Sequence, residues 1–430
     1  MQKILYIISI LFILIFSSHL YGQLEGYGSV TIGYHNNPLY NYQKLGDQIK
    51  QTYLEIKGSK DYANSTLGFS YVSGLMMFNQ FEERNFYEHT FATNYQIKIF
   101  NEKKKENVDT LSADGEESEE NQSDADSIQT EEDNPNYNSL IFGLSLGARH
   151  DKEIHQEFNN YGLTFTTTYK QEENPNFLFN LENSLSYRNY TYISELSNLT
   201  DVFSFQIGKK QEIGFNYGLK ISAGLKYYAQ TAYDTTRFEI IRSFVVKGAG
   251  KGKPGSKVYS QKQILIQPQS NGSYQLILDM SVGHNWTSTT IQTDFLYRYN
   301  PRSEIRYLAQ YVNTTFLSED IYNDFFSHEG PEATLKFTQK LPLNIQFKLD
   351  TEFLYKKFKA PALSLLGEQV AEKRIDLRTS LEITLSRYFD IGAGLGIDLS
   401  FNVGLMRNQS NDNYNDYSSN FISLGIGIGF

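Results

Sequence analysis

The sequence contains no cysteine, and only one of its 430 residues is tryptophan. The absence of cysteine excludes a disulfide scaffold, a thiolate metal site, a thiol nucleophile and a lipoprotein anchor. Long apolar runs are also missing beyond the N-terminus, where no stretch approaches the roughly 18 apolar residues that a spanning helix needs. Mean hydropathy is polar at −0.45. Together these absences exclude a helical membrane protein.

The formal net charge of −10 comes from one segment, residues 101–136, which holds thirteen acidic residues and three lysines. Charge is balanced elsewhere, so the chain lacks the basic surface that nucleic acid requires. The segment has little to bury, and we predict a disordered acidic insertion on the periplasmic side. A solvated insertion without function is the simplest interpretation. A tether for a basic periplasmic partner and a weak Ca²⁺ store are alternatives, although the spacing of an EF-hand loop is absent.

The first 22 residues have the pattern of a secretory signal peptide. Lys3 precedes an apolar stretch at 4–16, and a short polar region follows at 17–22. This order predicts export and cleavage before Gln23. An uncleaved anchor helix is the alternative.

From residue 24 onward, apolar residues recur at every second position in sixteen stretches. A period of two indicates strands with one apolar face, and stretches of about 10–16 residues suit strands that cross a bilayer at a tilt. The expected strands contain residues 24–32, 52–56, 67–71, 86–100, 140–148, 161–165, 177–187, 203–207, 213–227, 274–282, 291–299, 333–337, 343–355, 375–385, 391–405 and 417–430.

Short and long connections alternate between these stretches. All long connections fall on one side, and they include residues 230–272 and 300–331, which we predict to be extracellular loops. The acidic segment 101–136 is the exception on the side of the short turns. Transmembrane barrels have short periplasmic turns, longer extracellular loops and an even strand number. The rhythm therefore predicts a barrel with both termini in the periplasm.

The final stretch alternates apolar residues with Ser423 and three glycines, and it closes on an aromatic. Its apolar positions are Ile422, Leu424, Ile426, Ile428 and Phe430. This pattern resembles the C-terminal assembly signal of Gram-negative outer-membrane β-barrels. The resemblance implies an outer-membrane location, with membrane lipid and the barrel assembly machinery as partners. It is uninformative about substrate, and the porin-like families that the chain resembles are themselves largely uncharacterised.

The fold that these patterns predict for residues 23–430 is a closed, antiparallel, all-β transmembrane barrel of about 16 strands. Such a barrel encloses an aqueous lumen, so we predict a porin-like channel for small solutes without a cofactor. Polar residues of both signs at the alternate positions predict a lumen of weak ion selectivity. The lumen-lining candidates are Asp279, Gln292, Asp294, Lys336, Lys348, Asp350, Glu352, Arg378, Glu382 and Asp398.

Three alternatives remain open. One is a surface-binding or structural barrel with a plugged lumen, and another is an outer-membrane enzyme that processes lipid or peptide. The third is a secreted β-sandwich. The chain has no H-E-x-x-H, G-x-S-x-G or Walker A pattern, so enzymatic activity is not predicted.

Three stretches could carry more specific chemistry. Imidazole and carboxylate groups could hold Zn²⁺ at His150, Asp151, Glu153 and His155, but a solvated polar turn is simpler. The glycine-rich residues 248–255 lie between two alternating stretches and predict a hairpin with a basic tip rather than a phosphate loop. The aromatic residues in 300–331 could bind a glycan or pack into the barrel mouth.

Overall fold

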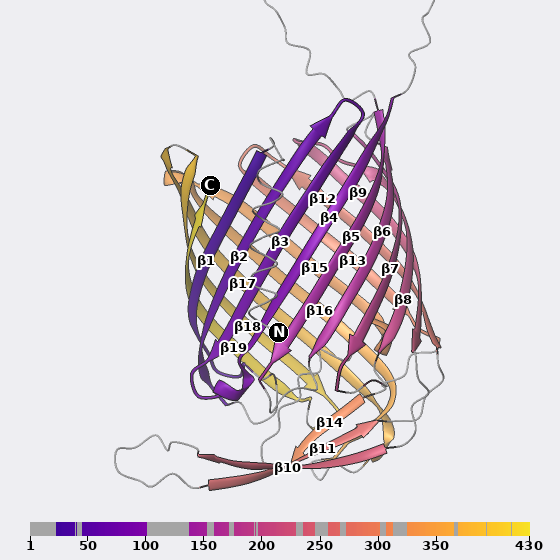
Figure 1. The fold of residues 1–430 in the computed structure, drawn as a ribbon, viewed down its shortest axis with the longest axis vertical. Coiled ribbons are helices and arrows are strands. Elements are labelled where there is room, and N and C mark those ends of the chain that lie inside the picture. The colour runs from indigo at the N-terminus through magenta and orange to yellow at the C-terminus, as the bar shows by residue number, and fades with distance from the viewer. Residues whose placement is uncertain are drawn as a thin grey trace, which may run out of the picture.

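A closed β-barrel of sixteen antiparallel strands forms the body of the molecule in this computed structural model (Figure 1). Each strand pairs with its two neighbours, and the wall closes where the first strand meets the last. The barrel strands are β1 (Gln23–His35), β2 (Asp47–Tyr62), β3 (Ser65–Phe78), β4 (Phe86–Phe100), β5 (Tyr137–Asp151), β6 (Asn160–Gln171), β7 (Phe177–Tyr190), β8 (Asn198–Lys209), β9 (Gly214–Tyr228), β12 (Gly272–Asn285), β13 (Thr289–Tyr299), β15 (His328–Leu341), β16 (Ile345–Leu363), β17 (Gln369–Gly392), β18 (Leu395–Ser410) and β19 (Tyr417–Gly429).

The structure describes most of the chain after the N-terminal segment. The described residues are 23–38, 40, 45–100, 137–152, 159–171, 176–192, 194, 197–228, 235–245, 257–266, 272–301, 307–312, 325–364, 369–392, 394–413 and 415–430. The predicted signal peptide 1–22 and the acidic segment 101–136 lie outside them. No helix within these ranges has the length and apolar composition that a bilayer-spanning helix requires.

All sixteen predicted strands are present, which confirms the fold class and the strand number. The largest difference concerns β16 and β17, which are 19 and 24 residues long. Their pairing continues to Leu363 opposite Gln369. The connection between the predicted strands 343–355 and 375–385 is therefore reduced to residues 364–368. Ile391 also belongs to the end of β17 and not to the start of β18.

The two ends of the barrel differ in their connections. At one end, which we name the turn end, β2 and β3 are joined by residues 63–64, and β17 and β18 by 393–394. In the second of these turns Gly392 and Gly394 have φ values of 88° and 79°, which glycine adopts without strain. The opposite end, the loop end, carries the long connections 229–271 and 300–327. By the usual arrangement of such barrels, the turn end is periplasmic.

A three-stranded sheet lies outside the barrel wall at the loop end (Figure 1). It consists of β10 (Thr235–Val245), β11 (Lys257–Ile266) and β14 (Tyr307–Val312). The β10–β11 hairpin agrees with the two alternating stretches of the sequence. The third strand was not predicted, because its six residues are defined by pairing with β11 and not by a pattern of their own.

The outer face of the barrel is an apolar belt between two aromatic girdles. Leu144 and Leu146, for example, are 44% and 50% exposed, as suits side chains that contact lipid. Exposed aromatic residues lie near both strand ends, where amphipathic rings meet the membrane interfaces. Those at the loop end include Tyr34, Tyr161, Tyr187, Tyr227 and Tyr299, and those at the turn end include Tyr62, Tyr95, Phe215, Trp286 and Phe389.

The predicted assembly signal forms the seam of the barrel. Ile422, Leu424, Ile426 and Ile428 pair with β1 in unbroken register and are 47–64% exposed on the apolar face. Phe430 exchanges two backbone hydrogen bonds with Gly26, of 2.8 and 2.9 Å, and its ring covers that glycine.

The glycines of β19 lie on the lumen side, where the absence of a side chain leaves space. One of these spaces is filled, because the Tyr27 ring lies directly over Gly427. The glycine therefore serves to seat an aromatic ring at the seam.

Candidate functional site

The lumen wall is formed by the polar face of the strands. All ten residues predicted to line it share one face of β12, β13, β15, β16, β17 and β18. Neighbouring positions on the same strands are exposed and apolar, as at Leu278 and Met280 beside Asp279. Because the apolar face contacts lipid, the polar face encloses the lumen. We name this part of the polar face the charged wall.

Ion pairs across neighbouring strands organise the charged wall. Lys336 Nζ lies 3.2 Å from Asp294 Oδ2, and Arg378 Nη2 lies 3.0 Å from Glu352 Oε1. Gln292 donates a 2.7 Å hydrogen bond to the Asp294 carboxylate. These side chains are partly exposed, so each pair contributes little to stability. Each ion pair instead affects the local electrostatics of the lumen, because its two opposite charges cancel.

Two carboxylates of the same wall lie side by side. Asp350 and Glu382 are directly opposite each other in the register of β16 and β17. Lys336 is the register partner of Asp350 on its other side, but its ammonium is paired with Asp294. The remaining candidates are separate: Asp279 lies opposite Lys220, Lys348 lies between Thr338 and Thr384, and Asp398 lies between Tyr388 and Gly427.

The loop end of the lumen is narrowed by a short 3-10 helix, η5 (Phe325–Ser327). Phe326 is 7% exposed, and its ring lies over Gly224 and about 6.0 Å from the Lys226 ammonium. Both of these β9 residues share the inward face with Lys220. The segment 300–331 therefore contributes a side chain to the mouth, although most of that segment lies outside the described residues.

Polar side chains on the inward face near the loop end are covered. Arg298 is only 5% exposed, and its guanidinium forms a 2.6 Å ion pair with the Glu332 carboxylate. Arg374 and Asp376 form an ion pair with side chains only 3% and 1% exposed. The Arg374 guanidinium also stacks on Phe358 at 4.3 Å. Inward side chains at this end are therefore packed against other groups and are not open to the lumen.

The weak candidate for a cation site is separated in the part of it that the structure describes. His150 lies on the outer face, where its ring stacks on Tyr87 with centroids 5.1 Å apart. Asp151 lies on the opposite face of β5, and its carboxylate is 2.9 Å from Arg149 Nε. Glu153 and His155 lie outside the described residues. Among the residues described, no group of three or more His, Asp or Glu side chains is placed to hold a metal ion.

A second chemical zone of the lumen is not among the residues predicted from the sequence, which are nine charged residues and Gln292. On β2 to β6 the inward positions near the turn end carry hydroxyls, an amide and glycines around a cavity of about 510 Å³. The signal was present in the sequence, since serine or threonine recurs at every second residue over 164–168. We name this zone the hydroxyl wall.

The even-numbered closed wall, the apolar belt, the two girdles and the short turns at one end are the architecture of bacterial outer-membrane proteins. The chain is an outer-membrane β-barrel. Its exterior therefore has membrane lipid as its surroundings.

This outer-membrane β-barrel is only distantly similar to barrels of known structure. No family model matches the chain, and no curated protein matches it. OprD from Pseudomonas aeruginosa is similar with a TM-score of 0.41 at 8% identity, covering 95% of this chain and 94% of that one. OccAB3 from Acinetobacter baumannii has a TM-score of 0.40 at 10% identity, covering 95% and 99%. OpdK from P. aeruginosa has a TM-score of 0.38 at 7% identity, also covering 95% and 99%. Likeness at this level does not identify a solute.

Proposed function

We propose that this barrel is a channel through which small polar solutes diffuse across the outer membrane. The observation that carries the proposal is the closed wall of sixteen strands with a polar inner face. A barrel of this strand number has a lumen wider than its own side chains fill, and such a lumen holds water. A solute that diffuses through a channel is not chemically changed, so this function requires no catalytic group.

The geometry of the mouth supports a size limit on the solute. Phe326 closes on the β9 wall over Gly224, and the surrounding polar side chains are covered. A narrow mouth above a wider polar lumen admits small solutes and excludes large ones. The cancelled charges of the Asp294–Lys336 and Glu352–Arg378 pairs support weak selectivity for ion sign.

A plugged surface barrel is the second candidate, and a specific observation favours it. Inward residues at the loop end, including Arg298, Lys356 and Arg374, are 2–9% exposed. If that cover extends across the whole mouth, no solute passes and the extracellular segments carry the function.

Ion conductance in planar bilayers distinguishes these candidates. For the channel we expect steady conductance from the folded wild-type protein. The Phe326→Ala variant should conduct more, because it removes the ring from the mouth. A matched control is Phe203→Ala, since Phe203 is 50% exposed on the lipid face and should not alter the current. A folded wild-type barrel that carries no current would overturn the channel proposal in favour of the plugged barrel.

A further inference from the structure

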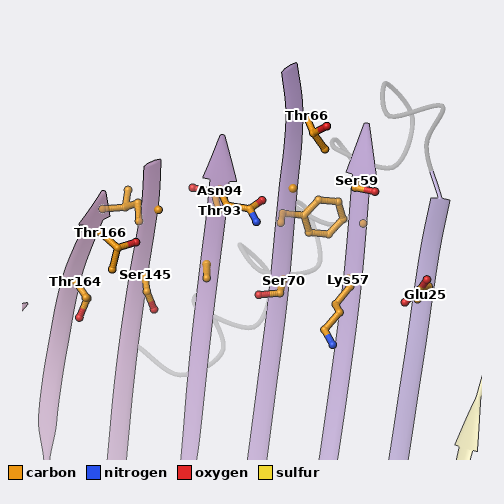
Figure 2. Close-up of a pocket in the computed structure, with 16 residues that line it drawn as sticks. Glu25, Lys57, Ser59, Thr66, Ser70, Thr93, Asn94, Ser145, Thr164 and Thr166 are labelled. Carbon is orange, nitrogen blue, oxygen red and sulfur yellow. The ribbon is translucent and has the colours of Figure 1, made fainter. Parts of the chain in front are cut away.

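The hydroxyl wall surrounds a cavity on the inner surface of six adjacent strands, β1 to β6 (Figure 2). Six hydroxyl side chains on its inward positions line the cavity: Ser59, Thr66, Ser70, Ser145, Thr164 and Thr166. Glu25 and Lys57 lie at one side, on β1 and β2. The cavity volume of about 510 Å³ is within the range of sites that hold small organic ligands.

Several of these groups have no hydrogen-bond partner within the described protein. Thr66 is bonded to Asp61, and Thr164 to Ser186 at 3.0 Å. The side chains of Ser59, Ser70 and Ser145, and those of Asn94 and Thr166, make no such bond within the same residue ranges. Hydroxyl and amide groups both donate and accept hydrogen bonds. The cavity therefore presents five polar groups whose bonding capacity is free for a solute.

Two glycines hold the cavity open. The Asn94 amide lies over Gly68, and the Thr166 hydroxyl lies over Gly143, where a Cβ atom on either glycine would collide with them. Neighbouring strands thus bring these two polar groups close to the wall surface and leave the space above them empty. A solute of moderate size can then approach the wall and contact the Asn94 amide and the Thr166 hydroxyl.

The two zones of the lumen suit different solutes. The charged wall on β12 to β18 can attract and stabilise ions, but the inward positions around Ser145 and Thr166 are uncharged. The charged residue Lys57 is the register partner of Ser70, at the β1–β2 side of the cavity. A hydroxyl-rich surface cannot balance the charge of an ion that has lost water. It can replace the water bonds of a neutral solute, because each hydroxyl of the solute finds a donor or an acceptor.

We propose that the hydroxyl wall is a binding site for uncharged polyhydroxylated solutes of the size of a short oligosaccharide. This inference rests on the proposed channel function and names the class of solute that the channel takes up. The five free polar groups bind the hydroxyls of the solute while it crosses the turn end of the lumen. The Glu25 and Lys57 side chains mark the edge of the site.

The test uses lactose as the uncharged probe and lactobionate as its carboxylate counterpart. The full chain is reconstituted in planar bilayers, and each ion current is normalised to the same protein without sugar. We expect lactose to block the wild-type current in a saturable way and lactobionate to block it several-fold less. Combining Ser70→Ala, Ser145→Ala and Thr166→Val should raise the half-blocking lactose concentration by about tenfold or more, since three hydrogen bonds are removed.

A matched control removes three hydroxyls from the opposite side of the lumen. Thr338→Val, Ser386→Ala and Ser400→Ala lie on β15, β17 and β18, again towards the turn end. This control should keep the wild-type half-blocking concentration. Equal effects of the two triple variants, or equal block by lactose and lactobionate, would overturn the binding site while leaving the channel intact.

A second measurement tests the binding site if the barrel does not conduct. If the folded barrel carries no current, the proposed function is overturned, and saturation-transfer NMR of lactose with the detergent-solubilised protein decides the site. Saturation transfer to lactose from the wild type and from the control, but not from the hydroxyl-wall variant, supports the site. Transfer that is equal in all three, or absent from all three, overturns it.

Discussion

At the scale of single residues, the alternation of apolar and polar side chains predicted which face of a strand each residue occupies. A strand directs successive side chains to opposite faces, so the inward position of residues such as Asp294 and Lys336 followed from counting by two. Their ion pair did not follow, because it depends on the register between β13 and β15. A shift of one residue in β15 would have placed Lys336 on the lipid face. Register is a property of two strands, and a single strand's sequence does not contain it.

The seam offers a prediction at this scale. Replacing Gly427 with valine places side-chain atoms where the Tyr27 ring lies. Overpacking of this kind costs about 1–3 kcal/mol, and we expect the urea midpoint of the refolded barrel to fall accordingly. Gly74→Val is the control, because the nearest atom to its added Cβ is 4.0 Å away. Adding Tyr27→Ala should recover part of the loss, and a seam variant as stable as the Gly74 control would contradict the role of the ring.

At the scale of elements, the sequence located strands well and their ends poorly. The sequence pattern that locates a strand is its apolar face, and this pattern stops where the strand leaves the lipid. β16 and β17 continue to pair beyond that point, with polar and charged residues such as Lys356, Lys357 and Lys373 that resemble a loop. The strand β14 was missed for the same reason, since nothing in its sequence marks contact with a membrane.

The outer part of β17 contains a buried ion pair between Arg374 and Asp376, and Arg374 also contacts Phe358 on β16. Asp376 also accepts a 2.6 Å hydrogen bond from Ser410 on β18. Asp376→Ala leaves the arginine charge buried without a counter-charge, which typically costs about 3–5 kcal/mol. We expect faster hydrogen exchange in the outer part of β16 and β17.

The control for this variant is Asp416→Ala, which breaks the pair between Arg407 and Asp416. These side chains are 40% and 42% exposed, so the loss should be at most about 1 kcal/mol. If the Asp376 variant exchanged no faster than this control, the buried pair would not be what holds the hairpin together.

At the scale of the whole molecule, strand number and closure were predictable because loop lengths and apolar stretches alternate along the entire chain. The hydroxyl wall was not. It is assembled from positions on the five strands β2 to β6, each of which contributes one or two small polar side chains that are unremarkable alone. Only the closed wall brings them to one surface.

Ion selectivity is a property of the whole lumen and should respond to its unpaired carboxylates. Asp350→Asn with Glu382→Gln removes two adjacent negative charges, and we expect the cation-to-anion permeability ratio to fall. Reversal potentials in a salt gradient measure this ratio. Glu352→Gln with Arg378→Met removes an ion pair without changing net charge, and it should leave the ratio close to that of the wild type. A ratio that falls equally in both would contradict the distinction between paired and unpaired charges.

The acidic segment should be dispensable for folding. β4 and β5 pair along their whole length, from Phe86 opposite Asp151 to Phe100 opposite Tyr137. Deletion of residues 103–134 removes nothing that contributes to this pairing. We expect wild-type yields of folded barrel, measured by heat-dependent migration in SDS gels. A lower yield would show that the segment acts in biogenesis, and a lost co-purifying basic protein would identify it as a tether.

The pairing of β1 with β19 also limits when the protein can fold. Val30 opposite Ile426 is a contact between positions near the two ends of the described chain, and contacts of such sequence separation form slowly. No closed wall exists before the last strand has been synthesised and delivered. Until then every lipid-facing side chain is exposed to water, and chains in that condition aggregate. The chain must therefore stay unfolded until it reaches the membrane.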